Sequence, residues 1–395
     1  MKHYYYILLC SYYLKTLMFR KMKKWNILFF ILFGSIINAS GQNGQPTNFK
    51  IDGTINVDSG KIHLNFYSDY IPSETKKIVA EVRNKKFSIS GYIPESQGVF
   101  IALDDRYLSS DFVIDKGTQT ININIDSVRK APVVKNKTML EEYPDYITFY
   151  KEINARRDLL YQKIDNLHKL YNYDLPDSIR LMLDEEQKAI YNASDSTLLK
   201  YAERNPDSKV AFWSLVRLMN WGYEPIFDSI YDAFSEILKN GYAGKILNDK
   251  LQYGNLLSVG QIFPPFNCQN ISDEKLSSHI FLKNKFTLVD FWFSSCGPCR
   301  RQFSHLRDLY KQYSGRGFEI VGISVDQTKN KKDWENVIVE EKLVWKQYWD
   351  KDGTESNRFS INVFPTTFLI DSTGKIIEKH ISMEALSEFL SSQEW

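Results

Sequence analysis

Apolar and polar residues alternate along several short segments in the first third of the chain. A period of two places successive side chains on opposite faces of a β-strand, and turn-forming residues separate the segments. The alternation predicts a sandwich-like all-β domain over residues 46–130, in which no catalytic constellation is visible. The expected strands cover residues 49–55, 61–66, 86–91 and 120–125.

The apolar spacing changes to the helical period of three and four over residues 138–255. Asn205-Pro206-Asp207-Ser208 predicts a capped helix start, because short polar side chains accept hydrogen bonds from the first free backbone amides. We therefore expect a helical linker domain, joined to the β-rich part by a linker at residues 131–134. The expected helices cover residues 141–170, 178–194, 210–216 and 231–238.

From residue 259 onward, strand patterns and helix patterns alternate. A strand–helix–strand unit followed by a hairpin predicts an α/β domain over residues 259–395. At 395 residues the chain is therefore expected to be multidomain, with an all-β part, a helical middle and a C-terminal α/β part. The expected strands of the last part cover residues 286–293, 318–325, 367–370 and 375–379, and its helices cover 296–313, 332–341 and 383–390.

The α/β part carries the motif Cys296-Gly297-Pro298-Cys299 directly after an apolar strand pattern. Two cysteines three residues apart at the first turn of a helix can close a small disulfide ring. The free amides and the dipole at a helix N-terminus favour a thiolate on Cys296, which can then attack a disulfide. Cys299 can resolve the mixed disulfide that forms.

Two further segments accompany this motif in sequence order: Val259 to Phe266, and Val363-Phe364-Pro365-Thr366-Thr367. Together the three resemble the thioredoxin superfamily, and within it the extracytoplasmic TlpA/ResA-like branch. The resemblance implies a thioredoxin-like fold and thiol–disulfide oxidoreductase activity. It also implies that Pro365 is cis beside the disulfide and that the backbone of Phe364 borders the substrate groove. In that groove we also expect Ser295, Gly297 and Pro298.

Asp290 stands six residues before Cys296, where thioredoxins bury an acid behind the disulfide. The resemblance implies that Asp290 assists proton transfer to or from Cys299, and burial would raise its pKa accordingly. The alternative is a solvated or paired carboxylate at a strand end. The chain departs from the family at Ser295, where Trp is usual, and at Gln302 and Ser304, where Glu and Pro are common.

The N-terminus predicts export. Met22 is followed by the basic residues Lys23 and Lys24, residues 25–37 form a short apolar core, and residues 39–41 are small. This order is typical of a signal peptide over residues 1–41, with Met22 as the expected true start. We expect a periplasmic or other extracytoplasmic location, with an uncleaved membrane anchor as the alternative. The first 40 residues hold six of the 50 basic residues and no acid, so the rest carries 44 bases against 48 acids, and a nucleic-acid partner is excluded.

Residues 46–130 resemble the β-rich domain of unknown function that precedes thioredoxin-like domains in Bacteroidetes proteins. The TlpA/ResA resemblance implies disulfide-containing proteins as partners and a membrane electron donor of the DsbD/CcdA type. By analogy it also suggests a role in cytochrome c maturation. The direction of electron flow stays open, and no cofactor is expected, because no haem motif, P-loop or dinucleotide fingerprint is present.

Three other functions compete with the reductase. A related thiol peroxidase would carry Thr or Ser three residues before the reactive cysteine, where this chain has Phe293. A zinc site would need a second pair of ligands, and His305 lies on the same predicted helix as the cysteines. A partner-binding protein with a secondary redox domain is the third. The remaining cysteine of the exported chain, Cys268, is expected to be a buried small residue.

Overall fold

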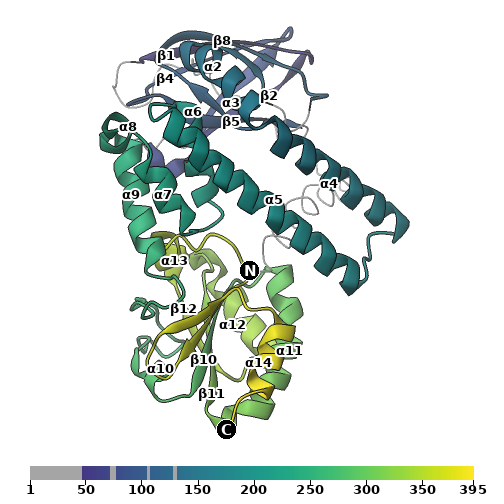
Figure 1. The fold of residues 1–395 in the computed structure, drawn as a ribbon, viewed down its shortest axis with the longest axis vertical. Coiled ribbons are helices and arrows are strands. Elements are labelled where there is room, and N and C mark those ends of the chain that lie inside the picture. Colours follow the sequence, from purple (N-terminus) through teal and green to yellow (C-terminus); the bar gives the residue numbers. More distant parts are fainter. Residues whose placement is uncertain (1–46, 72–76, 105–106, 128–130) are drawn as a thin grey trace, which may run out of the picture.

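The computed structural model describes residues 47–71, 77–104, 107–127 and 131–395. The predicted signal segment 1–41 and the start at Met22 lie outside the described residues. The β-rich part, the helical part and the α/β part follow one another along the long axis of the molecule (Figure 1). The multidomain prediction is therefore confirmed.

The β-rich part is one hydrogen-bonded sheet of nine strands in the order β6-β5-β2-β3-β4-β1-β8-β9, with β7 paired to β5. Strand β1 lies antiparallel to β4 and parallel to β8. Strands β3 and β4 pair only at Arg83 and Lys86, so the sheet divides there into two halves that share one apolar core. The strands are β1 Phe49–Ile55, β2 Ser59–Phe66, β3 Lys77–Arg83, β4 Lys86–Gly91, β5 Gln97–Leu103, β6 Tyr107–Leu108, β7 Phe112–Ile114, β8 Gly117–Ile123 and β9 Val133–Lys135.

The linker expected at residues 131–134 is wrong. Val133–Lys135 forms strand β9, and Val134 pairs with Ile121 of β8. Three residues are too few to show an alternating pattern, so only the pairing partner reveals this strand. The sheet thus extends beyond the 46–130 segment in which the alternation is readable.

The helical part contains α2 Lys137–Glu141, α3 Tyr143–Phe149, α4 Lys151–Leu170, α5 Asp177–Arg204, α6 Lys209–Met219, α7 Ile226–Asp232, α8 Glu236–Asn240 and α9 Tyr242–Asn255. The helix expected over 141–170 is broken at Glu142 and Tyr150. The one expected over 231–238 is wrong, since α7 ends before Phe234 and α8 starts after Ser235. The Ser235 amide donates to the carbonyl of Pro206 instead, which holds this segment out of helical geometry. The predicted cap is confirmed at Ser208, whose side chain accepts from the Ala211 amide.

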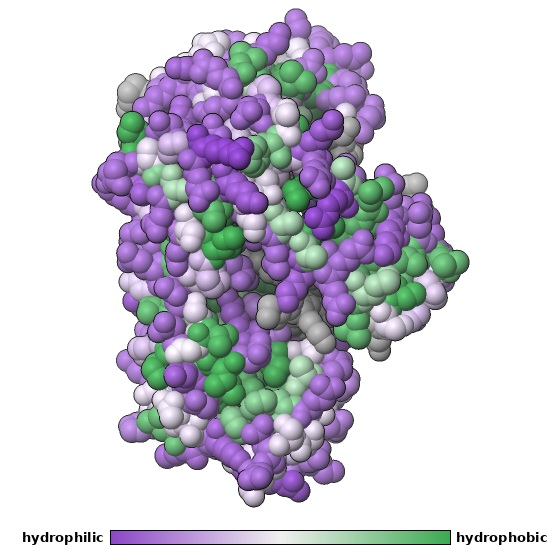
Figure 2. All heavy atoms as spheres, in the orientation of Figure 1, coloured by the Kyte–Doolittle hydropathy of each residue, from purple (hydrophilic) through white to green (hydrophobic). Residues whose placement is uncertain are grey.

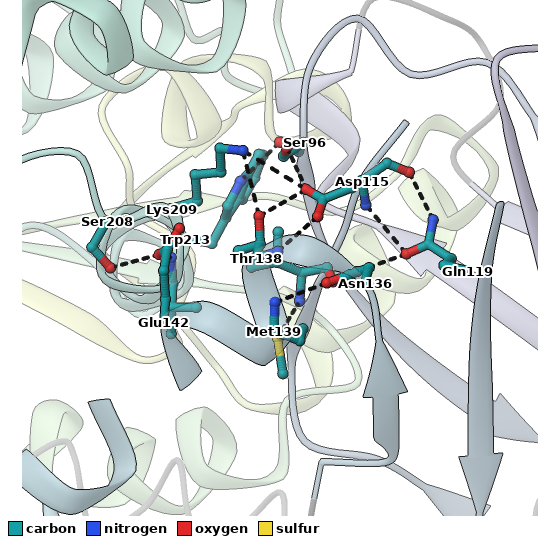
Figure 3. Close-up of polar contacts among 12 residues, drawn as sticks. Ser96, Asp115, Gln119, Asn136, Thr138, Met139, Glu142, Ser208, Lys209 and Trp213 are labelled. Atoms are coloured by element: carbon teal, nitrogen blue, oxygen red, sulfur yellow. Dashed lines mark hydrogen bonds and ion pairs between the residues drawn. The ribbon is translucent and has the colours of Figure 1, made fainter. Parts of the chain in front are cut away.

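The helices and the sheet share one core. Trp213 of α6 packs on Gly98 of β5 so closely that a Cβ there would lie 2.6 Å from the indole, and its Nε1 donates to the carbonyl of Ser96. Figure 3 shows the polar contacts around this junction. The Asp115 carboxylate accepts from Ser96 and from the amide and hydroxyl of Thr138 at the start of α2. The β-rich and helical parts therefore form one packed unit.

Helices α4 and α5 form an antiparallel pair that projects sideways from this unit (Figure 1). The ion pair between Lys163 and Glu186 joins them at 2.6 Å. Their outer surfaces carry exposed apolar side chains, and Figure 2 shows such residues on the projecting pair among a mostly polar surface. The exposed apolar residues of α4 and α5 include Leu159, Leu170, Leu181 and Met182. Within the described ranges, no helix is long and apolar enough to cross a membrane.

The α/β part has a five-stranded sheet in the order β12-β11-β10-β13-β14. Central β10 is parallel to β11 and antiparallel to β13. Helices α11, α12 and α14 contribute to the core on one face of the sheet, and the chain before β10 covers the other. The elements are α10 His279–Leu282, β10 Phe286–Trp292, α11 Gly297–Tyr313, β11 Phe318–Ser324, α12 Lys331–Glu340, β12 Lys346–Trp349, α13 Thr354–Arg358, β13 Thr366–Asp371, β14 Ile376–Lys379 and α14 Met383–Ser391.

Candidate active site

The two motif cysteines form a disulfide at the N-terminus of α11. Cys296 and Cys299 are bonded, with their Cα atoms 5.3 Å apart. Cys296 is the cap residue of α11, and its Sγ accepts a hydrogen bond from the Cys299 amide at 3.1 Å. In the reduced protein the same amide and the helix dipole would stabilise a thiolate on Cys296. Cys296 retains 3% exposure and Cys299 none, so Cys296 is the sulfur that a partner can reach.

The loop before β13 lies against the loop before Cys296. The Phe364–Pro365 peptide bond is cis. The Phe364 ring packs edge-on against Phe293, with ring centroids 5.6 Å apart. The other predicted groove residues flank Cys296: Ser295, in the turn before α11, and Gly297 are exposed, and Pro298 of α11 is half-buried. The contact of Phe364 with Phe293 therefore brings the loop of Pro365 against the loop that leads to Cys296.

Asp290 lies in the middle of the sheet, paired with Gly322 of β11 and Thr367 of β13. It is 1% exposed, so the alternative of a solvated carboxylate does not hold. Burial raises the pKa of Asp290 to about 8, although the hydrogen bond from Gln302 lowers it. Gln302 Nε2 donates to Asp290 Oδ1 at 2.9 Å, while Oδ2 has no hydrogen-bond partner among the described residues.

Residues 259–379 match the AhpC/TSA family. The matched residues include the disulfide at the start of α11, the cis bond before Pro365 and the buried Asp290. Residues 259–395 form a thioredoxin-like domain.

Several relatives of the thioredoxin-like domain are named thiol-disulfide oxidoreductases. The thiol-disulfide oxidoreductase ResA of Oceanobacillus iheyensis is 28% identical over 152 residues, which cover 37% of this chain and 78% of the relative. The ResA of Bacillus cereus is 29% identical over 125 residues, covering 32% and 70%. The solved thioredoxin domain of a thiol-disulfide oxidoreductase from Bacteroides vulgatus is 31% identical, with a TM-score of 0.32 and coverage of 34% of this chain and 96% of that one.

These matches confirm the TlpA/ResA-like resemblance of the thioredoxin-like domain, which carries the dithiol/disulfide pair of a thiol–disulfide oxidoreductase. The resemblance of residues 46–130 to a β-rich domain of Bacteroidetes proteins stays a prediction.

The thioredoxin-like domain also contains a residue that the sequence did not single out. Asp326 follows β11, is 3% exposed and accepts hydrogen bonds from both the amide and the hydroxyl of Ser294, two residues before Cys296. A polar residue at the carboxyl end of the strand parallel to β10 is the signal that could have found it. Parallel neighbours end at the same edge of a sheet, so Asp326 had to lie near the cysteine loop.

The third cysteine of the described residues, Cys268, is fully buried, and burial raises the pKa of its thiol well above the usual value. A thiol of this kind is a poor nucleophile. The prediction of a buried small residue is confirmed. In the part of the chain that the structure describes, no group of three or more acidic, histidine or cysteine side chains could hold a metal ion, and His305 is exposed on α11.

Proposed function

We propose that this thiol–disulfide oxidoreductase works outside the cytoplasm and reduces disulfides of exported proteins. One observation carries the chemistry. Cys296 caps α11 and is bonded to the fully buried Cys299, while the loop of the cis Phe364–Pro365 bond packs on Phe293, three residues before Cys296. The predicted signal segment and the resemblance to the extracytoplasmic TlpA/ResA branch support the location. The Gly297-Pro298 dipeptide between the cysteines, shared with reducing thioredoxins, supports the direction.

The reaction transfers two electrons from the dithiol to the partner. The Cys296 thiolate attacks one sulfur of the partner disulfide, which forms a mixed disulfide and releases the other sulfur as a thiolate. Cys299 then loses its proton and attacks Cys296 Sγ. The Cys296–Cys299 disulfide forms, and the second partner sulfur leaves as a thiolate. A dithiol donor, for which a membrane protein of the DsbD/CcdA type is proposed, reduces the enzyme again.

Asp290 is proposed to accept the Cys299 proton. Gln302 lies one turn after Cys299 on α11, and its hydrogen bond to Asp290 places that carboxyl beneath the first turns of the helix. Because Oδ2 has no partner among the described residues, it is available for the proton. A carboxyl with a pKa of about 8 exchanges protons efficiently near neutral pH.

The substrate groove is proposed to run between the loop of Phe364 and Pro365 and the segment Ser295 to Pro298. The backbone of Phe364 would pair with an extended segment of the partner, as in other strand-addition complexes. The half-buried rings of Phe293 and Phe364 form an apolar floor beside Cys296. A partner with an apolar residue next to its disulfide would fit this floor.

The test combines a redox titration with activity. The reduction potential of the Cys296–Cys299 pair, equilibrated against a glutathione or dithiothreitol series, should lie in the range of reducing thioredoxins. A potential near that of strongly oxidising periplasmic enzymes would instead assign disulfide donation or isomerisation. Hydrogen peroxide should consume the dithiol far more slowly than a protein disulfide does, because Phe293 occupies the position of the peroxidase Thr or Ser.

The exposed apolar residues on α4 and α5 favour a second candidate, a partner-binding protein whose redox domain is secondary. A fragment that begins at Val259 distinguishes a self-sufficient reductase from a partner-binding protein. Apart from Leu257, the buried residues of the two cores on the faces of the C-terminal sheet all lie from Phe263 onward, so the fragment should fold. We expect it to keep full reductase activity toward small disulfides. Loss of that activity in a folded fragment would show that the redox domain depends on the N-terminal unit.

A further inference from the structure

Asp326 joins the two loops that follow the central parallel strands. Its Oδ2 accepts from the Ser294 amide at 2.8 Å and from the Ser324 hydroxyl at 2.7 Å. Its Oδ1 accepts from the Ser294 hydroxyl at 2.6 Å. Three hydrogen bonds thus converge on one buried side chain, and the Ser294 amide among them can only donate, so Oδ2 acts as an acceptor.

The loop that Asp326 holds is the one that presents Cys296. Ser294 is buried, and without a partner its backbone amide would lose a hydrogen bond away from water. Ser294 lies in a tight turn, which a hydrogen bond from the Cys296 amide to the Phe293 carbonyl closes at 3.0 Å. The position of the Cys296 backbone is therefore set by the Asp326 carboxylate on one side and by the start of α11 on the other.

The Asp326 residue is itself held in place. Its carbonyl accepts from Trp349 Nε1 at 2.7 Å, at the end of β12. The neighbouring Val325 amide donates to the Trp292 carbonyl at 2.9 Å, which extends the pairing of β10 and β11 up to the cysteine loop. A rigid carboxylate of this kind can position a neighbour more precisely than a solvated one.

We propose that Asp326 is a positioning residue for Cys296. It fixes the turn before the nucleophile and places a carboxylate on the loop that presents it. This inference rests on the proposed function. It adds a residue that does not touch the substrate but sets the geometry and the electrostatics of the attacking sulfur.

The sign of the charge effect follows from the surrounding groups. The helix terminus favours the Cys296 thiolate, whereas a fixed carboxylate nearby disfavours it. Other charged or titratable side chains near the motif are Asp290 below α11, and Arg301, whose guanidinium approaches Gly297. Arg300, directly after Cys299, is paired with Glu341. Asp326 therefore destabilises the Cys296 thiolate, which the helix terminus and Arg301 stabilise. This lowers the reduction potential of the Cys296–Cys299 pair, so the dithiol is a stronger reductant.

The experiment uses the full chain with Asp326→Asn and Asp326→Ala. An amide can keep the geometry, because its oxygen still accepts from the Ser294 amide while its NH2 group donates to the Ser294 hydroxyl. Asp326→Asn thus removes the charge, and Asp326→Ala removes charge and geometry. Asp352→Asn is the matched control, since exposed Asp352 accepts from the amide and hydroxyl of Thr328 in the same two-bond pattern.

We expect Asp326→Asn to lower the pKa of Cys296 by about one unit, read from the ultraviolet absorbance of the thiolate in a Cys299→Ser background. The reduction potential of the Asp326→Asn pair should rise with it. Asp326→Ala should also slow the reduction of a protein disulfide by roughly tenfold, because the turn loosens. Asp352→Asn should change neither quantity.

An Asp326→Asn protein with the wild-type Cys296 pKa and potential would overturn the electrostatic role. A folded Asp326→Ala protein with the wild-type rate would overturn the positioning role. If Asp326→Ala does not fold, Ser294→Ala serves instead, since it removes only the hydroxyl contact and should slow the reaction less. Should the wild-type pair fail to cycle at all, the proposed function fails, which is a different outcome from an unchanged variant.

Discussion

Gln302 Nε2 donates a hydrogen bond to Asp290 Oδ1 at 2.9 Å, across the interface between α11 and the central strand. Both residues are buried, and the family commonly has Glu where this chain has Gln302. An amide cannot exchange a proton with the carboxyl as a second acid could. The contact therefore orients Asp290 and leaves one oxygen of the carboxyl for the resolving cysteine.

Replacing Gln302 with Leu should raise the pKa of Asp290 above about 8, because a hydrogen bond to the charged form is lost while burial remains. The pH at which the resolving step reaches half its maximal rate should move upward with it. Carboxyl titration by NMR checks the first effect and single-turnover kinetics the second. Gln312→Leu, at an exposed position of the same helix, should leave both unchanged.

Asp290→Asn should stabilise the protein at alkaline pH. The pKa of this carboxyl is about 8 in the folded protein and near 3.8 in the unfolded chain. The unfolded state therefore loses its proton first, and wild-type stability falls as pH rises between these values, by roughly 6 kcal/mol at most. The variant lacks this fall, so the two proteins should differ in urea unfolding near pH 8 and converge near pH 4.

Two measurements check the Asp290→Asn prediction further. The variant should resolve mixed disulfides about ten- to a hundredfold more slowly near neutral pH, since its proton acceptor is gone. Asp371→Asn is a control of opposite sign, because hydrogen bonds from Thr373 and Lys375 outweigh its burial and lower the pKa of Asp371. Equal stability of wild type and Asp290→Asn at every pH would contradict the buried neutral carboxyl.

Reduction should expose one reactive thiol. A brief treatment with an alkylating agent is expected to modify Cys296 and to spare Cys299 and Cys268, which are fully buried. Cys299→Ser should trap mixed disulfides with substrate proteins, and Cys296→Ser should form none. Peptide mass mapping identifies the modified residue. Preferential modification of Cys299 would reverse the assigned roles.

Lys250 links three parts of the chain. Its Nζ lies 2.9 Å from Asp69 of the β-rich part and 3.1 Å from Asn357 Oδ1 of the thioredoxin-like domain. Its carbonyl accepts from the Ser360 hydroxyl, five residues before Pro365. Lys250→Met should cost about 1 kcal/mol and speed hydrogen exchange over residues 358–364. Lys245→Met, exposed on the same helix, is the control, and equal exchange in both variants would argue against this link.

The features that the sequence determined by itself are local ones. Alternation over residues 49–55 predicts the bounds of β1, and the short polar side chain of Ser208 predicts the start of α6. The motif of Cys296 and Cys299 predicts the disulfide, because three residues of separation at a helix start bring the two sulfurs together. These outcomes depend on residues within a few positions of one another, where propensity and spacing act directly.

Tertiary structure decided the rest through contacts between distant segments. Strand β9 forms because Val134 pairs with Ile121 of β8. Asp326 contacts Ser294 because β10 and β11 pair in parallel and end at the same edge of the sheet. The burial that raises the pKa of Asp290 comes from neighbours on β11, β13 and α11 together. No local sequence pattern predicts these contacts between distant segments. The free energy of such contacts, and the shift of the Asp290 pKa, arise only when the folded sheet removes the groups from water.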